Sequence, residues 1–351
     1  MVWGIVSDVA FAFVVWSGVV LFALVVVAAV QLVVLRVVAG IRIRRQRRLE
    51  RVWLPLMMCG LDKVPDSLPR LRGRDVRTLL SVWNRVHDAI KGTANAPLLD
   101  LARRIGLDRA ARRMFSRTDI RDRLLAITTL GRLADRVLWN ELVQLTSTQD
   151  LALSLAAARA MVRIDPRSAT TLLLPIVAER DDWPPSTVAL MLQEAGADVI
   201  SDPLVKAVLR TPQERAHRLI RYLGLAHCDA TVPLLNHLIR EVESVESITA
   251  CLRVFTDAKD VVAIEPFLHH PRWEVRVCAV KALGRLGTRR DEGPLIAMLS
   301  DLEWWVRYRA AQALCGLVSD DVDRLKRLRD THSDPFARDI LTHVLAEQGA
   351  A

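Results

Sequence analysis

The stretches WEVRVCAVKALGRLG (residues 273–287) and WWVRYRAAQALCGLV (residues 304–318) match each other near the C-terminus. The pair Val275-Arg276 of the first recurs as Val306-Arg307 in the second, which gives a period of 31. An internal period of this length is typical of proteins built from stacked repeats, and missing it leads to a wrong fold assignment. The two stretches therefore predict a repeat architecture, and the period can be followed along the chain.

One apolar trio marks the period. Leu283 follows Ala282 and Ala279, which lie one and four positions before it. The same position recurs at residues 130, 161, 192, 223, 252, 283, 314 and 345, with spacings of 31, 31, 31, 29, 31, 31 and 31. All members of these trios are apolar except Thr129. The register predicts about eight units with this period, over residues 117–349.

The sequence pattern of each unit predicts two helices. In the clearest unit the apolar residues fall at i, i+4, i+7, i+8 and i+11, as one face of a helix requires: Val275, Ala279, Ala282, Leu283 and Leu286. A polar turn follows, and Pro294 suits the first turn of a second apolar helix. Such a hairpin cannot bury its own apolar face, so neighbouring hairpins stack into a continuous core. We predict an all-α, α-α superhelical solenoid.

These repeats resemble the HEAT family, in particular the short HEAT-like units first grouped with phycobilisome lyases. The resemblance rests on the pattern V-R-x-x-A-x-x-A-L-G-x-L at Val275 to Leu286 and, with Cys315 before the glycine, at Val306 to Leu317. It extends over about residues 117–349 and is strongest in the last three units. It implies an armadillo/HEAT-like solenoid.

The resemblance also implies a structural role for one arginine in each repeat. In that family the arginine after the valine commonly bonds to an acidic or backbone group of the neighbouring repeat. The matching positions here are Arg123, Arg276, Arg307 and Arg338. Three central units have Pro185, Ala216 and Val245 instead. We expect a ladder of arginines that is interrupted in the middle, at a bend or at a site.

Residues 9–35 form a run without a single charge, in which only Gln31 is strongly polar. At 1.5 Å per residue, a helix of this length spans roughly 40 Å, more than the ~30 Å hydrocarbon layer of a bilayer. A secretory signal begins with basic residues, whereas Asp8 is the only charge before this run. We therefore predict one transmembrane helix over residues 9–35 rather than a cleaved signal.

Arginines gather directly after this run, in a basic juxtamembrane segment over residues 36–51. The positive-inside rule places them in the cytoplasm, which leaves residues 1–8 as a short extracytoplasmic N-terminus. We expect a single-pass protein of the inner, cytoplasmic membrane with its solenoid inside. The candidate contacts to lipid headgroups are Arg42, Arg44, Arg45, Arg47, Arg48 and Arg51. The alternative is that the arginines only set the topology.

The formal net charge of the chain is +9. Asp8 contributes −1 and residues 36–51 contribute +6, from seven arginines and Glu50, so residues 52–351 carry +4. This weak charge gives little reason to expect nucleic-acid binding, which depends on neutralising phosphates. Residues 52–116 contain two amphipathic stretches, Val76 to Ile90 and Leu98 to Ile105, and we predict that this helical region caps or links the solenoid.

No motif in the sequence predicts catalysis. The chain has no G-x-x-x-x-G-K-[ST], G-x-G-x-x-G, H-E-x-x-H or G-x-S-x-G pattern. Its five cysteines are widely spaced without a C-x-x-C pair, and three lie within apolar helical patterns where we expect them to be buried. No histidine precedes a glutamate, unlike the iron-binding HEAT-like hydroxylases. We expect no metal, no cofactor and no small-molecule substrate, and the chain is not predicted to be an enzyme.

Three tryptophans are the candidate partner-binding residues: Trp273, Trp304 and Trp305. They open successive first helices, so neighbouring repeats place them near one edge, either exposed for a partner or filling the groove between repeats. We predict a membrane-anchored scaffold or adaptor that binds a protein, such as a subunit of a membrane, envelope or polysaccharide-synthesis complex. Two alternatives are a HEAT-like enzyme of the chromophore-lyase or DNA-glycosylase type, and a protein whose arginine run is the functional part.

Overall fold

The computed structural model of the chain describes residues 2–59, 73–90, 95–318, 321–347 and 349. All regular structure in these ranges is helical, which confirms the predicted fold class at the level of an all-α chain. The chain divides into two compact units, Met1–Leu133 and Ala134–Ala351.

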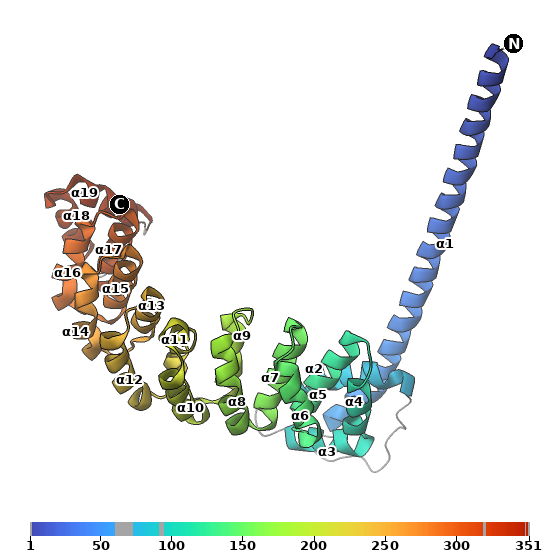
Figure 1. Cartoon of the computed structure of the whole chain (residues 1–351), viewed down its shortest axis with the longest axis horizontal. Helices are drawn as coiled ribbons and strands as arrows, with labels where there is room; N and C mark the ends of the chain where they lie inside the picture. The colour runs from blue at the N-terminus through green and yellow to red at the C-terminus, as the bar shows by residue number, and fades with distance from the viewer. Residues whose placement is uncertain (1, 60–72, 91–94, 319–320, 348, 350–351) are drawn as a thin grey trace. The chain divides into compact units, whose positions relative to one another are not determined.

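The first unit begins with one long helix, α1 (Val2–Cys59). It passes without interruption through residues 8, 35 and 51, where the sequence predicted boundaries between segments (Figure 1). Its C-terminal end packs against α2 (Val76–Ala89), where Trp53 and Met57 are buried. The end of α1 is therefore held by the folded part of the unit.

The predicted transmembrane run over residues 9–35 falls within α1. Many of its side chains lie outside the described residues. Among the residues that are described, no helix combines the length and the apolarity needed to cross a membrane.

Four shorter helices complete the first unit: α2, α3 (Asn95–Ile105), α4 (Leu107–Phe115) and α5 (Ile120–Arg132). The two amphipathic stretches of the sequence correspond to α2 and α3. Trp83 is fully buried between them and donates a hydrogen bond from Nε1 to the Leu98 carbonyl at 3.4 Å. Asn84 donates to Oγ1 of Thr129 at 3.0 Å. Thr129, the polar exception in the repeat register, is thus a buried hydroxyl with a partner.

The second unit stacks helical hairpins. The first helices of its repeats are α7 (Leu151–Ile164), α9 (Pro185–Ala195), α11 (Gln213–Ile220), α13 (Val245–Val254), α15 (Trp273–Leu286), α17 (Trp304–Leu317) and α19 (Pro335–Glu347). The second helices are α6 (Trp139–Thr146), α8 (Pro166–Glu179), α10 (Ala197–Arg210), α12 (Cys228–Glu241), α14 (Val261–Ile264), α16 (Glu292–Ala297) and α18 (Val322–Thr331). Within this unit the helices α13, α15 and α17 form one row and α12, α14, α16 and α18 form another (Figure 1).

The packing follows the repeat register of the sequence. Each of the eight marker residues is buried, and the most exposed of them, Leu192, is 5% exposed. Of the trio members only Ala313 is not buried. A Cβ placed on Gly284 of α15 would lie 2.5 Å from Cβ of Ala313 on α17. The glycine of the repeat motif therefore allows neighbouring first helices to approach closely.

The middle repeats are less regular. Helix α11 ends at Ile220, and the marker Leu223 lies in a separate short 3-10 turn (Leu223–Leu225). This repeat precedes the one spacing of 29 in the register. The shortened first helix is the structural counterpart of the sequence irregularity in this region.

The cysteines in the apolar patterns are buried, as predicted. Cys251 is 0% exposed, Cys315 2% and Cys278 7%, whereas Cys228 is exposed. Burial in an apolar environment disfavours the thiolate and raises the pKa of Cys251 to about 12. Burial also raises the pKa of the Cys315 thiol. These groups act as small core residues.

Candidate partner-binding surfaces

Among the arginines expected from the repeat motif, Arg276 bonds both to an acidic side chain and to backbone carbonyls. Its Nε and Nη2 donate to the two carboxylate oxygens of Asp301 at 2.7 and 2.8 Å. Its Nη1 donates to the carbonyls of His270 and Pro271 at 2.9 and 3.1 Å. The carboxylate raises the pKa of Arg276. One side chain thus joins the turn before α15 to the turn before α17.

Arg307 uses only part of this arrangement. Its Nη1 donates to the carbonyls of Asp301 and Leu302 at 2.7 and 3.0 Å. In place of a carboxylate it meets the ring of Phe336, whose centroid lies 5.4 Å from its Cζ. The partner position that Asp301 occupies for Arg276 is occupied by His332 for Arg307. The change of residue explains the change of contact.

The two remaining ladder arginines differ again. Arg338 is exposed, and its side chain makes no hydrogen bond or ion pair with any residue that the structure describes. Arg123, in the first unit, lies over the ring of Phe115, with its Cζ 5.8 Å from the centroid. The predicted ladder therefore has one complete rung, at Arg276.

Where the motif arginine is absent, residues at other positions make the contacts between repeats. Ser154 stands at the ladder position of α7, a departure that the sequence interpretation missed, and it accepts a hydrogen bond from Nε1 of Trp183 at 3.1 Å. Arg180 reaches back from the end of α8 and donates to the carbonyls of Thr146 and Thr148 at 3.0 and 2.7 Å. Arginine side chains thus satisfy carbonyls at the C-terminal end of a second helix even where the motif is absent.

The three candidate tryptophans are all exposed. Trp273 is 38% exposed, Trp304 43% and Trp305 50%. Trp304 and Trp305 meet edge to face with centroids 4.7 Å apart. Trp304 also stacks on Tyr308 of the same helix at 4.9 Å and an interplanar angle of 10°. Trp273 makes no ring contact within the described part of the chain, so the structure brings two of the three tryptophans together.

Two further exposed apolar residues lie beside Arg307 of the same helix, α17. Leu302 is 95% exposed and Phe336 is 65% exposed, and Arg307 contacts both of them. We refer to Leu302, Trp304, Trp305, Tyr308 and Phe336 together as the aromatic surface. Sequence reasoning missed Phe336, although it occupies the same position in the last repeat as Trp305 does in the repeat before it.

Two charged groups contact Tyr308 of the aromatic surface. Tyr308 donates a hydrogen bond from its hydroxyl to Oε2 of Glu347 at 3.0 Å, which raises the pKa of this tyrosine. The guanidinium of Arg309 lies over the Tyr308 ring, 5.5 Å from its centroid. Aromatic and arginine side chains held in this way lose little conformational freedom when a partner binds.

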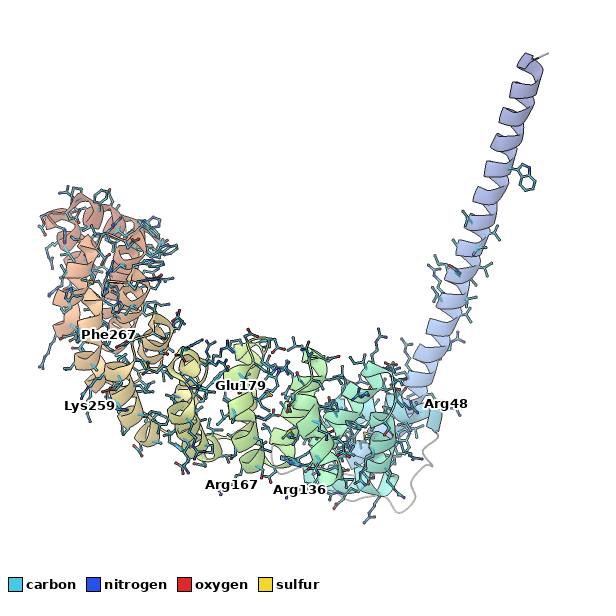
Figure 2. All side chains as sticks on the ribbon, viewed as in Figure 1. Arg48, Arg136, Arg167, Glu179, Lys259 and Phe267 are labelled. Carbon is cyan, nitrogen blue, oxygen red and sulfur yellow. The ribbon has the colours of Figure 1, made fainter. Side chains whose placement is uncertain are left out.

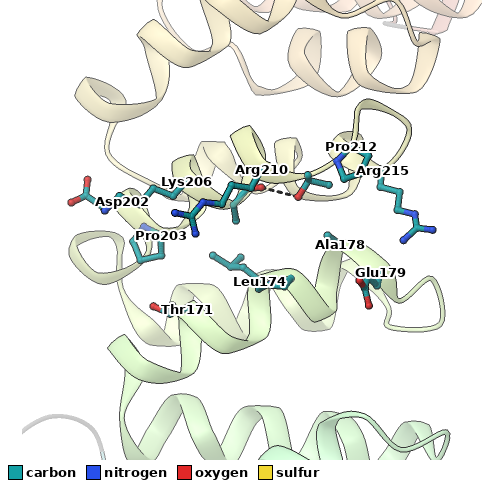
Figure 3. A pocket seen from close by; sticks show the side chains of 13 residues that line it. Thr171, Leu174, Ala178, Glu179, Asp202, Pro203, Lys206, Arg210, Pro212 and Arg215 are labelled. Atoms are coloured by element: carbon teal, nitrogen blue, oxygen red, sulfur yellow. Dashed lines mark hydrogen bonds between the residues drawn. The ribbon is translucent and has the colours of Figure 1, made fainter.

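Two grooves lie between second helices of the second unit. One, of about 410 Å³, separates α8 from α10 and reaches the start of α11. The other, of about 840 Å³, separates α12 from the α14 segment and includes Val262 and Phe267. Figure 3 shows the first groove, with Leu174 and Ala178 on one wall and Lys206 and Arg210 on the other. Sequence reasoning did not find either groove.

The candidate headgroup contacts of the juxtamembrane segment are exposed where the structure describes them, at Arg44, Arg47, Arg48 and Arg51. Figure 2 shows Arg48 near the C-terminal end of α1. The side chains of Arg42 and Arg45 lie outside the described residues. Glu50 forms an ion pair with Arg85 of α2, so the acidic residue of this segment is neutralised within the first unit.

In the described ranges, no group of three or more His, Cys, Asp or Glu side chains is placed to hold a metal ion. His270 is the second of two adjacent histidines before α15. Its Nδ1 accepts a hydrogen bond from the Arg272 amide at 3.1 Å, so this ring nitrogen has a partner within the turn. The His270 ring also stacks on Phe267, with centroids 6.4 Å apart.

Comparison with known proteins finds a family that matches the C-terminal repeats. The family of HEAT repeats matches residues 261–346. The comparison with curated proteins finds no match. A crystal structure of an engineered protein matches with 17% identity and a TM-score of 0.22, over 69% of this chain and 96% of that one. The part of the chain from α14 to α19 is therefore similar to HEAT repeats.

Proposed function

We propose that the chain is a membrane-anchored scaffold that binds a protein partner through its HEAT repeats. The aromatic surface is the observation that supports this proposal. The proposed role is binding rather than catalysis. The partner class that we propose is another subunit of a membrane or envelope complex, and the phycobilisome-lyase type of the repeats stays a prediction from the V-R-x-x-A pattern.

The aromatic surface has the composition of a protein interface centre. Tryptophan, tyrosine and arginine are the residue types that contribute most to protein binding, and here they lie within one short stretch and its neighbouring repeat. Exposed apolar patches with polar rims mark interaction sites on soluble surfaces. Leu302, at 95% exposed, gains the most apolar burial when a partner covers it.

Site-specific photo-crosslinking tests the proposed surface. The full chain, expressed in its own cells, carries p-benzoylphenylalanine in place of Trp305, and in a matched control in place of the exposed Asp323 on α18. We expect one reproducible crosslinked protein from position 305 that is absent from position 323. Identical products from both positions would exclude the aromatic surface as the specific contact.

The anchor is proposed from the uncharged run over residues 9–35. We propose a single pass through the cytoplasmic membrane, with the N-terminus outside and the repeats inside, in line with the arginines after the run. Alkaline extraction of membranes tests this: the full chain should stay with the lipid, and a chain that begins at Trp53 should be released. Release of both chains would refute the anchor.

Lipid contact by the juxtamembrane arginines needs a separate test. A chain that begins at Arg42 keeps most of the arginine cluster, whereas a chain that begins at Trp53 has lost it. If the arginines contact headgroups, the longer chain should bind vesicles containing anionic lipid more tightly, and salt should weaken the difference. Equal vesicle binding by both chains would leave the arginines with a topological role alone.

A further inference from the structure

The groove between α8 and α10 exists because its walls are built from short or rigid side chains. Helix α8 contributes Leu174, Pro175 and Ala178, and helix α10 contributes Pro203 and Ala207. Alanine and proline side chains cannot reach across the gap between two helices, so a volume of about 410 Å³ stays open. Clefts of this size commonly hold ligands or side chains of a partner.

The side of the groove formed by α10 and the start of α11 is cationic. Lys206 and Arg210 of α10 and Arg215 of α11 line it, and their side chains make no hydrogen bond or ion pair with any of the residues that the structure describes. Nearby arginines are engaged: Arg163 pairs with Glu194 at 2.6 Å and Arg180 with Asp182 at 2.5 Å. The groove is therefore lined by cationic side chains that form no ion pair within the described residues.

Two carboxylates limit where an acidic ligand can lie. Asp202 and Glu179 line opposite ends of the groove, while Lys206 and Arg210 lie between them on the wall of α10 (Figure 3). An anionic group is therefore favoured in the middle of the groove, and like-charge repulsion disfavours it at the ends. The apolar residues Leu174 and Ala178 on the wall of α8 lie opposite this middle section.

A proline interrupts the backbone hydrogen bonds of the α8 wall. Pro175 lies inside α8 and has no N–H, so the carbonyl of Thr171 lacks its usual i+4 donor. Thr171 and Pro175 both line the groove. The groove thus places an apolar wall opposite a cationic one, which suits a peptide with apolar and acidic side chains better than an acyl chain.

We propose that this groove binds a short acidic segment of a protein partner. An apolar side chain of the segment lies on Leu174 and Ala207, and a neighbouring aspartate or glutamate meets Lys206 and Arg210. The proposal rests on the proposed function only in taking a protein as the partner, because the groove and the aromatic surface share no residue.

A peptide array tests the ligand class. The full chain, purified in detergent and fluorescently labelled, is applied to peptides that combine leucine, isoleucine or phenylalanine with aspartate or glutamate at every spacing, beside versions with lysine or serine at the acidic positions. We expect binding to the acidic apolar peptides alone. Absence of binding above background, or equal binding of the lysine versions, would overturn the proposal.

Charge reversal assigns the binding to the groove. The affinities of the best peptides are measured by fluorescence anisotropy for Lys206→Glu/Arg210→Glu and for the control Arg167→Glu, an exposed residue near the start of α8 (Figure 2). The double variant should weaken binding about tenfold or more, whereas the control should not change it. Ala207→Phe, which fills the groove without changing charge, should also abolish binding, and thermal melts of each variant verify folding.

The outcomes separate this proposal from the proposed function. If Trp304→Ala/Trp305→Ala abolishes peptide binding and the groove variants do not, the groove proposal fails and the aromatic surface stands. If the groove variants alone lose binding, the groove is the peptide site. Tighter, salt-sensitive binding of duplex DNA to the same residues would replace the peptide with a nucleic acid and would also overturn the proposal.

Discussion

Arg276 and Asp301 form a two-bond ion pair that links successive repeats. The two hydrogen bonds are 2.7 and 2.8 Å long, and the two side chains are 14% and 7% exposed. Paired bonds between arginine and carboxylate are among the stronger polar contacts in proteins because geometry and charge reinforce each other. The same guanidinium also satisfies two carbonyls, so four hydrogen bonds depend on it.

Replacing Arg276 should therefore destabilise the repeats. Arg276→Met leaves the carboxylate of Asp301 largely buried without its cation, and breaking a buried pair from one side lowers the free energy of unfolding by roughly 3 kcal/mol. The measurement is the midpoint of urea unfolding, followed by far-UV circular dichroism. Arg338→Met is the matched control and should change the midpoint little, because the Arg338 side chain has no partner among the described residues.

A double-mutant cycle distinguishes the pair from a general loss of packing. Adding Asp301→Asn to Arg276→Met should cost less than Asp301→Asn does alone, because the pair is already broken. Additive effects of the two changes would mean that the ion pair does not couple the repeats.

The contact between Gly284 and Ala313 gives a steric prediction. In Gly284→Ala the new methyl group would lie 2.5 Å from Cβ of Ala313, so α15 and α17 must move apart. Overpacking of this kind lowers the free energy of unfolding by about 1–3 kcal/mol. The thermal unfolding midpoint should fall, although alanine favours helices more than glycine does.

Gly316 is the control for this steric effect. It lies within α17, and a Cβ at this position meets nothing within 4 Å. Gly316→Ala should therefore stabilise the helix by up to about 1 kcal/mol. Adding Ala313→Gly to Gly284→Ala should restore part of the loss, and a failure of this rescue would place the strain elsewhere.

The sequence predicted the repeat core well because burial follows one periodic stripe. Leu283 and its equivalents are buried in every repeat, including Leu223, which lies outside a regular α-helix. Thr129 breaks the apolar pattern without breaking the register, because Asn84 supplies its hydroxyl with a donor. Residue type alone could not show that partner, which lies 45 positions away along the chain.

The sites were less predictable because they depend on pairs of positions rather than on one. Arg276 and Arg307 occupy the same motif position, yet Asp301 serves the first and Phe336 the second. Trp273 matches Trp304 in the repeat, but Trp304 stacks on Tyr308, whereas the position equivalent to Tyr308 in the earlier repeat is Val277. The groove between α8 and α10 arises from small residues on two helices, which no single motif describes.

Arg180 should stabilise the interrupted part of the arginine ladder. Its side chain is 15% exposed and satisfies the carbonyls of Thr146 and Thr148. Arg180→Met leaves both carbonyls without this donor, which should lower the free energy of unfolding by about 2 kcal/mol. Urea unfolding checks this against Arg167→Met, a control on the same helix whose side chain is exposed. Equal midpoints for the two variants would show that solvent satisfies the carbonyls equally well.

Thiol labelling tests the burial of the cysteines and its dependence on pH. Exposed Cys228 should react with iodoacetamide in the folded chain, whereas Cys251, which is 0% exposed, should react only after unfolding.

The pKa of Cys251 is raised by burial from 9.0 to about 12, so its thiol stays protonated at pH 10. An unfolded thiol has largely ionised at that pH, and the proton that the folded state alone retains makes the chain less stable as pH rises above 9.0. Mass spectrometry of the labelled peptides assigns each rate, and rapid labelling of Cys251 in the folded chain would contradict its place in the core of α13.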